Sequence, residues 1–138
     1  MKALVLDSEA ISQFARTPND ATRGREALGR LVGALQCGAD VLVPAAVLAE
    51  QYRGGRHNQA IDACIARHPG LEVIDTTREL AKHIGGLLAR AGRGSADHVD
   101  ASVVATAVQH GGGLILTGDP DDIERLAAGI NNIVVRAI

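Results

Sequence analysis

Short apolar runs alternate with longer stretches of helical periodicity along the whole chain. The runs are β-branched or leucine-rich and bounded by Gly, Pro, Asp or Asn, which is typical of strands. They predict strands at residues 3–6, 41–43, 71–74, 114–116 and 133–135. Because the runs are almost continuously apolar, we expect strands buried on both faces, as in a parallel sheet.

Apolar residues recur at helical spacing between these runs. The pattern predicts helices at residues 8–15, 22–36, 45–52, 58–68, 77–91, 96–109 and 120–127. Strands that alternate with helices predict an α/β fold, here a three-layer α/β/α sandwich around a central parallel sheet of about five short strands. The 138 residues suit a single domain, 1–138.

Aromatic residues are almost absent, since Phe14 and Tyr52 are the only two. The core is therefore aliphatic, and RNA-binding modules that stack bases on aromatic platforms are excluded. Phe14 and Ile11 share one face of the first helix, where a core contact is expected and a groove for a protein partner is the alternative. The net charge of −2 excludes a general polycationic coat for nucleic acids but not a local basic patch.

Cellular location is indicated by what the sequence lacks. Cys37 and Cys64 form neither a disulfide framework nor a zinc motif, which fits a reducing compartment. No apolar run approaches the roughly 20 residues of a membrane span. The opening segment meets an acid at Asp7, too early for a signal peptide. We expect a soluble, cytoplasmic protein without membrane contact.

Two acids follow predicted strands directly. Asp7 ends the first strand, and Asp119 lies three residues beyond Leu116, the end of the fourth. Ligands of open α/β sheets bind beyond the carboxyl ends of the strands, which makes both acids candidate site residues. Ordinary alternatives exist: an acid near a helix start is favourable anyway beside a capping Ser8, and Asp119 can serve as a turn before Pro120.

Glu50 ends an apolar helical segment and shares its face with Val47, three residues earlier. A carboxylate buried there is costly unless it is paired or bound to a metal. The alternative places Glu50 at the surface near Arg53 or Arg56.

Asp97 and Asp100 lie on one face of a helix that Ser95 is expected to cap. Val104 continues the face from Asp100, so this acid heads an inward-pointing stripe. The favourable interaction of an acid with the start of a helix explains Asp97 well, but it explains Asp100, further into the helix, poorly. Two adjacent acids beside a buried stripe therefore indicate a bound cation.

Charge is segregated along the chain. Residues 94–124 contain six acids and no Lys or Arg, whereas 12 of the 14 basic residues are arginines that lie elsewhere. An acidic pocket rimmed by arginines suits a metal-dependent phosphodiesterase, because arginine binds phosphate through a two-pronged contact. A donor set made only of carboxylates selects Mg²⁺ or Mn²⁺. No phosphate-binding glycine loop or serine-hydrolase motif appears.

The ordered segments LVLDSEAI, VPAAVLAEQYRG, DHVDASVVATA and LTGDPDDIERL resemble the PIN-domain family, and specifically VapC-type toxin ribonucleases. The resemblance covers the whole chain. It implies a PIN-like fold and a Mg²⁺- or Mn²⁺-dependent endoribonuclease that cleaves structured RNA such as tRNA or rRNA. It also implies a VapB-type antitoxin as partner and a homodimer.

Residue by residue, Asp7, Glu50, Asp100 and Asp119 match the family's catalytic and metal-binding acids, and Asp97 matches an extra acid of a subset. Thr117 and Ser8 match polar residues behind the ligands. We expect Glu9 to face solvent, although family members carry a smaller or apolar residue there. The candidates for contact with the RNA backbone are Arg53, Arg56, Arg90 and Arg93.

The expected mechanism is attack by a metal-activated water, with Glu50 as ligand of a second ion or as general base. Two other functions remain open. One is a PIN-like binding module without catalysis. The other is a haloacid-dehalogenase-type phosphatase with Asp7 as nucleophile, although its usual Asp-x-Asp motif is replaced by Asp7-Ser8-Glu9.

Overall fold

The computed structural model describes residues 3–16, 29, 33–34 and 37–138. The helix predicted at 22–36 therefore lies mostly outside the described residues. The other predicted elements are all present, in the predicted order.

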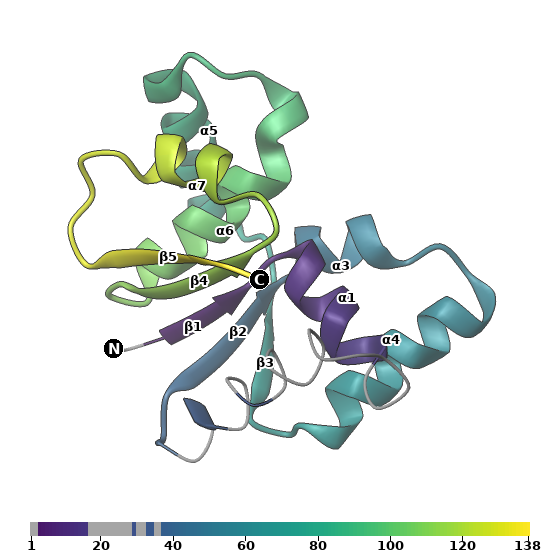
Figure 1. The fold of residues 1–138 in the computed structure, drawn as a ribbon. Coiled ribbons are helices and arrows are strands. Elements are labelled where there is room, and N and C mark those ends of the chain that lie inside the picture. Colours follow the sequence, from purple (N-terminus) through teal and green to yellow (C-terminus); the bar gives the residue numbers. More distant parts are fainter. Residues whose placement is uncertain (1–2, 17–28, 30–32, 35–36) are drawn as a thin grey trace.

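Five strands form one sheet in the order β3-β2-β1-β4-β5. Every neighbouring pair is parallel, as the continuous apolar runs indicated. The strands are β1 (Ala3–Leu6), β2 (Asp40–Pro44), β3 (Leu71–Ile74), β4 (Gly113–Thr117) and β5 (Ile133–Ala137). β1 lies in the middle, with β2 on one side and β4 on the other, so its carboxyl end faces the centre of one sheet edge (Figure 1).

Helices cover both faces of the sheet, which confirms the three-layer α/β/α architecture (Figure 1). One layer contains α5 (Arg78–Ala91), α6 (His98–Gln109) and α7 (Pro120–Ala127), and α6 packs on β1, β2 and β4. The opposite layer contains α1 (Ser8–Arg16), α3 (Ala45–Gln51) and α4 (Gly55–Arg67). A single 3₁₀ turn, η1 (Ser95–Asp97), leads into α6.

Helix starts deviate most from the sequence prediction. α4 begins at Gly55, three residues earlier than predicted, and Asn58 lies at the end of its first turn. The side-chain oxygen of Asn58 reaches back to accept hydrogen bonds from the backbone N–H groups of Arg53 (2.9 Å) and Gly54 (2.8 Å). Such a backward contact satisfies donors that a helix start leaves unpaired.

The core is aliphatic, as predicted. All four residues of β1 are buried, and α6 has seven consecutive buried residues, 101–107. Ile11 and Phe14 are 0% and 1% exposed, so both belong to the core and offer no groove to a partner. Within the described ranges, no helix has the length and apolar character needed to cross a membrane.

Candidate active site

Asp7 lies where β1 passes into α1, at the centre of the sheet's carboxyl edge. Its backbone N–H continues the pairing with β4 by donating to the Leu116 carbonyl, 3.1 Å away. Its Oδ1 accepts hydrogen bonds from the backbone amides of Glu9 (3.0 Å) and Ala10 (3.3 Å). Asp7 therefore caps α1 itself, in a buried position where it is only 6% exposed.

Ser8 is not the helix cap that the sequence suggested. Because Asp7 fills that role, the Ser8 hydroxyl is free to donate a hydrogen bond to Oε1 of Glu50. This contact joins the start of α1 to the last turn of α3 across the hollow. Ser8 thus orients a second carboxylate of the candidate site.

Glu50 is exposed rather than buried on the apolar face of α3. The buried residues of this helix are Val47 and Leu48. At about 100° per residue, Glu50 lies about 60° around from Val47 but about 160° from Leu48, at the rim of the buried face. Glu50 faces a water-accessible hollow and not the core. The prediction that it is buried was therefore wrong. Its predicted place in the site is compatible with this geometry.

Asp119 follows β4 in the same way that Asp7 follows β1. The two strands are in direct register, with Leu6 opposite Leu116. Between the acids lies Thr117, fully buried, whose hydroxyl accepts from the Asp119 amide (2.9 Å) and hydrogen-bonds the Asp7 carboxylate. This shared hydroxyl fixes how the two strand ends present their acids.

Asp97 and Asp100 come from the start of α6. The helix begins at His98, and Asp97 rather than Ser95 stands at the cap position, so the predicted Ser95 cap was wrong. Val104 and Ala107, below Asp100, are fully buried, as the stripe predicted. Carboxylate oxygens of Asp97, Asp100 and Asp122 lie within 4.8 Å of one another, which brings Asp122 of α7 into the site.

A hollow of about 570 Å³ connects these elements. Four of the predicted acids line it: Asp7, Glu50, Asp100 and Asp119. Its remaining wall is made by Ser8, Glu9, Gln51, Val99 and Gly118. Four separate elements thus bring acids to one place.

Glu9 does not face open solvent, contrary to the prediction. It lines the hollow and accepts a hydrogen bond from Gln13 at 2.8 Å. Its side chain packs so closely on Gly118 that a Cβ added there would lie 2.8 Å from Cβ and Cγ of Glu9. The glycine before Asp119 is the sequence signal that indicates this contact, since close approach of another chain segment is a common reason for glycine.

Burial and mutual repulsion define the electrostatics of the site. Burial, reinforced by the charges of Asp119, Asp122, Asp7 and Asp97, raises the pKa of Asp100 to about 6. Burial also raises the pKa of Asp7, against the opposing effect of its hydrogen bonds with Thr117 and nearby amides. The pKa of Asp119 is raised by a hydrogen bond with the Asp122 carboxyl. The site therefore carries more negative charge than its surroundings compensate.

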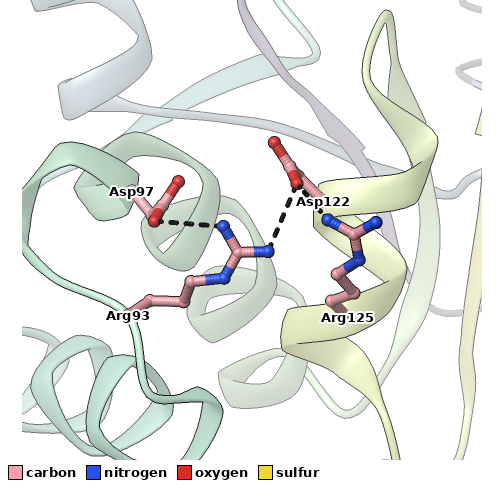
Figure 2. Close-up of polar contacts among 4 residues, drawn as sticks. All are labelled: Arg93, Asp97, Asp122 and Arg125. Carbon is pink, nitrogen blue, oxygen red and sulfur yellow. Dashed lines mark hydrogen bonds and ion pairs between the residues drawn. The ribbon is translucent and has the colours of Figure 1, made fainter.

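Two arginines approach the acids, so charge segregation is less complete than the sequence suggested. Arg93 lies 3.6 Å from Asp97 and 3.5 Å from Asp122, and Arg125 lies 3.2 Å from Asp122 (Figure 2). The other predicted RNA contacts point elsewhere: Arg90 donates to the Leu126 carbonyl (3.0 Å), and Arg53 to the carbonyls of Ala49 and Tyr52. Arg56 is exposed at the start of α4.

The donor set fits a hard divalent cation. Opposite ligands of Mg²⁺ lie about 4.2 Å apart, since each bond is about 2.1 Å long. Oxygens of Asp97, Asp100 and Asp122 that already lie within 4.8 Å need only a small movement to close on such an ion. The raised pKa of Asp100 also indicates negative charge that a cation would relieve.

Comparison with known proteins identifies what this arrangement is similar to. The family model described as PIN domain matches residues 4–129. Comparison with the curated proteins gives no match. Among solved structures, VapBC2 from Rickettsia felis bound to a DNA fragment from its promoter is 16% identical, with a TM-score of 0.67 over 99% of this chain and 98% of that one.

Two further solved structures share the fold over almost the whole chain. DNA-bound VapBC from Salmonella typhimurium is 19% identical, with a TM-score of 0.65 over 99% of this chain and 98% of that one. A toxin-antitoxin complex from Klebsiella pneumoniae is 17% identical, with a TM-score of 0.63 over 96% of both chains.

Proposed function

The chain belongs to the PIN domain family, and we propose that it is a Mg²⁺- or Mn²⁺-dependent endoribonuclease of the VapC toxin type. The observation that carries the proposal is the convergence of Asp7, Glu50, Asp100 and Asp119 on one hollow at the carboxyl edge of the sheet. Such an all-carboxylate site suits phosphodiester hydrolysis, in which charge develops on phosphate oxygens. The substrate we propose is structured RNA, such as tRNA or rRNA.

In the proposed mechanism, Asp7, Asp100 and Asp119 would hold a divalent ion in the hollow, and Asp97 and Asp122 lie beside Asp100. Such an ion would supply positive charge for the scissile phosphate and would lower the pKa of a water molecule. The Asp7 carboxylate is held by the two amides that its Oδ1 caps and by the Thr117 hydroxyl, which also accepts from the backbone N–H of Asp119, so this carboxylate does not have to reorganise.

Glu50 takes the role of general base. Ser8 donates to one of its oxygens, which leaves the other free to accept a proton from the attacking water. Because water and not the ribose 2′-hydroxyl is the nucleophile, the products carry a 5′-phosphate and a 3′-hydroxyl. Cleavage therefore also proceeds on RNA whose 2′-hydroxyls are methylated at the cut site.

The test is cleavage of total RNA by the purified protein with Mn²⁺, followed by mapping of the cut ends. We expect discrete cuts with 5′-phosphate ends, lost in EDTA and in Asp7→Asn and Asp100→Asn. The matched control is Asp40→Asn, which removes an exposed acid at the opposite end of the sheet. Cleavage by Asp100→Asn at the unchanged rate contradicts the assignment of the site. Absence of cleavage by the wild-type chain on any RNA contradicts the proposed activity and favours a binding module.

A small VapB-type antitoxin is the partner we propose, in the cytoplasm, with the toxin as a homodimer. Support comes from the solved structures of the same fold, which are VapBC or toxin-antitoxin complexes. Co-expression with a candidate VapB-type antitoxin tests the pairing. We expect a co-purifying complex that no longer cleaves RNA; a chain that stays alone and active contradicts it. Light scattering on the free chain measures its molecular mass and so shows whether it forms the proposed dimer.

A further inference from the structure

Arg93 lies directly beyond the end of α5. Gly92 ends this helix in a left-handed conformation (φ 66°), and the backbone N–H of Arg93 donates to the Leu88 carbonyl at 2.8 Å. This helix-ending motif fixes the backbone of Arg93. The side chain then extends toward the acids.

The guanidinium of Arg93 bridges two acids of the cluster Asp97, Asp100 and Asp122. One nitrogen lies 3.6 Å from Asp97 and the other 3.5 Å from Asp122, so a single side chain connects η1 with α7 (Figure 2). Those same carboxylates, together with Asp100, are the oxygens that converge within 4.8 Å. Arg93 thus offsets part of the repulsion among these three acids.

Arg125 provides the contrast. Among the described residues it pairs with Asp122 alone, from the same helix (Figure 2). Its side chain is 62% exposed, against 31% for Arg93. An exposed pair on one helix contributes little, because solvent and salt screen it. Both arginines carry one positive charge and contact Asp122, but only Arg93 of the two also contacts Asp97.

We propose that Arg93 is the internal counter-ion of the acid cluster in the metal-free protein and that a divalent cation displaces it on binding. This inference rests on the proposed metal site. An ion held at Asp100, which has Asp97 and Asp122 beside it, brings a second positive charge next to Arg93, and the two cations repel each other. The guanidinium then leaves the acids and becomes available to a phosphate of the substrate, the contact for which it is suited.

The experiment compares Arg93→Gln with Arg125→Gln at constant ionic strength. Mn²⁺ affinity is measured by calorimetry on the metal-free proteins, and thermal unfolding is measured in EDTA. We expect Arg93→Gln to bind Mn²⁺ about fivefold more tightly and to melt at a lower temperature without metal, whereas Arg125→Gln stays within twofold of wild type. Arg93→Lys, which keeps the charge, should bind Mn²⁺ like wild type.

Equal affinities of the two glutamine variants, or weaker binding by Arg93→Gln, overturn the inference. Absence of Mn²⁺ binding in the wild-type chain overturns the proposed metal site instead, so the two failures are distinguishable. If Arg93→Gln does not fold, NMR on the wild-type chain provides the test instead. The Nε–H resonance of Arg93, assigned by its loss in Arg93→Lys, should shift when Mg²⁺ is added. An unchanged resonance at saturating Mg²⁺ contradicts displacement of Arg93 by the ion.

Discussion

Replacing Asp100 by Asn should stabilise the metal-free protein at alkaline pH. The folded protein holds the Asp100 proton more tightly than the unfolded chain does, because its pKa rises from 3.8 to about 6. Unfolding therefore releases a proton between these values, and the free energy of unfolding falls as the pH rises through them. Above pH 6 the carboxylate is ionised in the folded protein too, so its full destabilising effect is present.

The magnitude follows from the same shift. A pKa difference of about two units corresponds to about 3 kcal/mol, and solvent access to this half-buried group reduces the effect to about 1–2 kcal/mol. Asparagine has the same shape without the charge. Asp100→Asn should therefore raise the melting temperature by about 4–8 °C at pH 8, since 1 kcal/mol shifts a domain of this size by roughly 4 °C.

The assay is thermal unfolding in EDTA, followed by circular dichroism at 222 nm. At pH 4.5 the stabilisation should fall to about a third of its value at pH 8, because most of the cost of ionising the group has then disappeared. Asp40→Asn, which removes an exposed acid at the opposite end of the sheet, is the matched control. A variant that is less stable than wild type at pH 8, or equally stabilised at both pH values, refutes the reasoning.

Substitutions at three further positions probe how the site is held. Asp7→Asn should be more stable than Asp7→Ala by about 1 kcal/mol in urea unfolding, because only Asn keeps the oxygen that caps α1; equal stabilities would disprove the capping role. Thr117→Val removes a hydrogen bond that lowers the pKa of Asp7, so the pH midpoint of Mn²⁺ binding in calorimetry should rise, and an unchanged midpoint counts against that link. Gly118→Ala places a Cβ 2.8 Å from the Glu9 side chain and should lower stability by about 1–2 kcal/mol in thermal unfolding; an unaltered melting temperature contradicts the close contact.

The sequence was sufficient for the sheet because strand signals are local and strong. The apolar runs that predicted strands at 3–6 and 71–74 coincide with β1 and β3. Both central acids were found by one rule, that ligands lie beyond the carboxyl ends of parallel strands. Asp7 and Asp119 stand there because β1 and β4 are neighbours in register.

Side-chain partners at helix starts were harder to predict, since several residues compete for the same cap. Ser8 is a good capping residue by type, yet Asp7 takes that role and leaves Ser8 to hydrogen-bond Glu50. Ser95 lost its expected role for a comparable reason, because a 3₁₀ turn precedes α6. Such outcomes depend on neighbours that are distant in sequence.

Contacts between α5, η1 and α7 were not accessible from spacing either. Arg93 and Asp122 are 29 residues apart, and only the packing of α5 and α6 against α7 brings them together. The acidic stretch therefore looked uncompensated in the sequence, whereas in the fold an arginine from outside the stretch enters it. Asp122 joined the site for the same reason.

The position of β1 in the middle of the sheet also has a consequence for the order of synthesis. Its partner β4 begins at Gly113, opposite Ala3, so the first strand made waits for almost the whole chain before its second edge is paired. Asp100 and Asp119 both lie in the last third of the chain. A growing chain thus lacks two of the four acids of the hollow until that third is being made, and products truncated before Asp119 carry no complete site. At about 5–20 residues per second, Asp119 follows Asp7 by several seconds, during which the proposed site is incomplete.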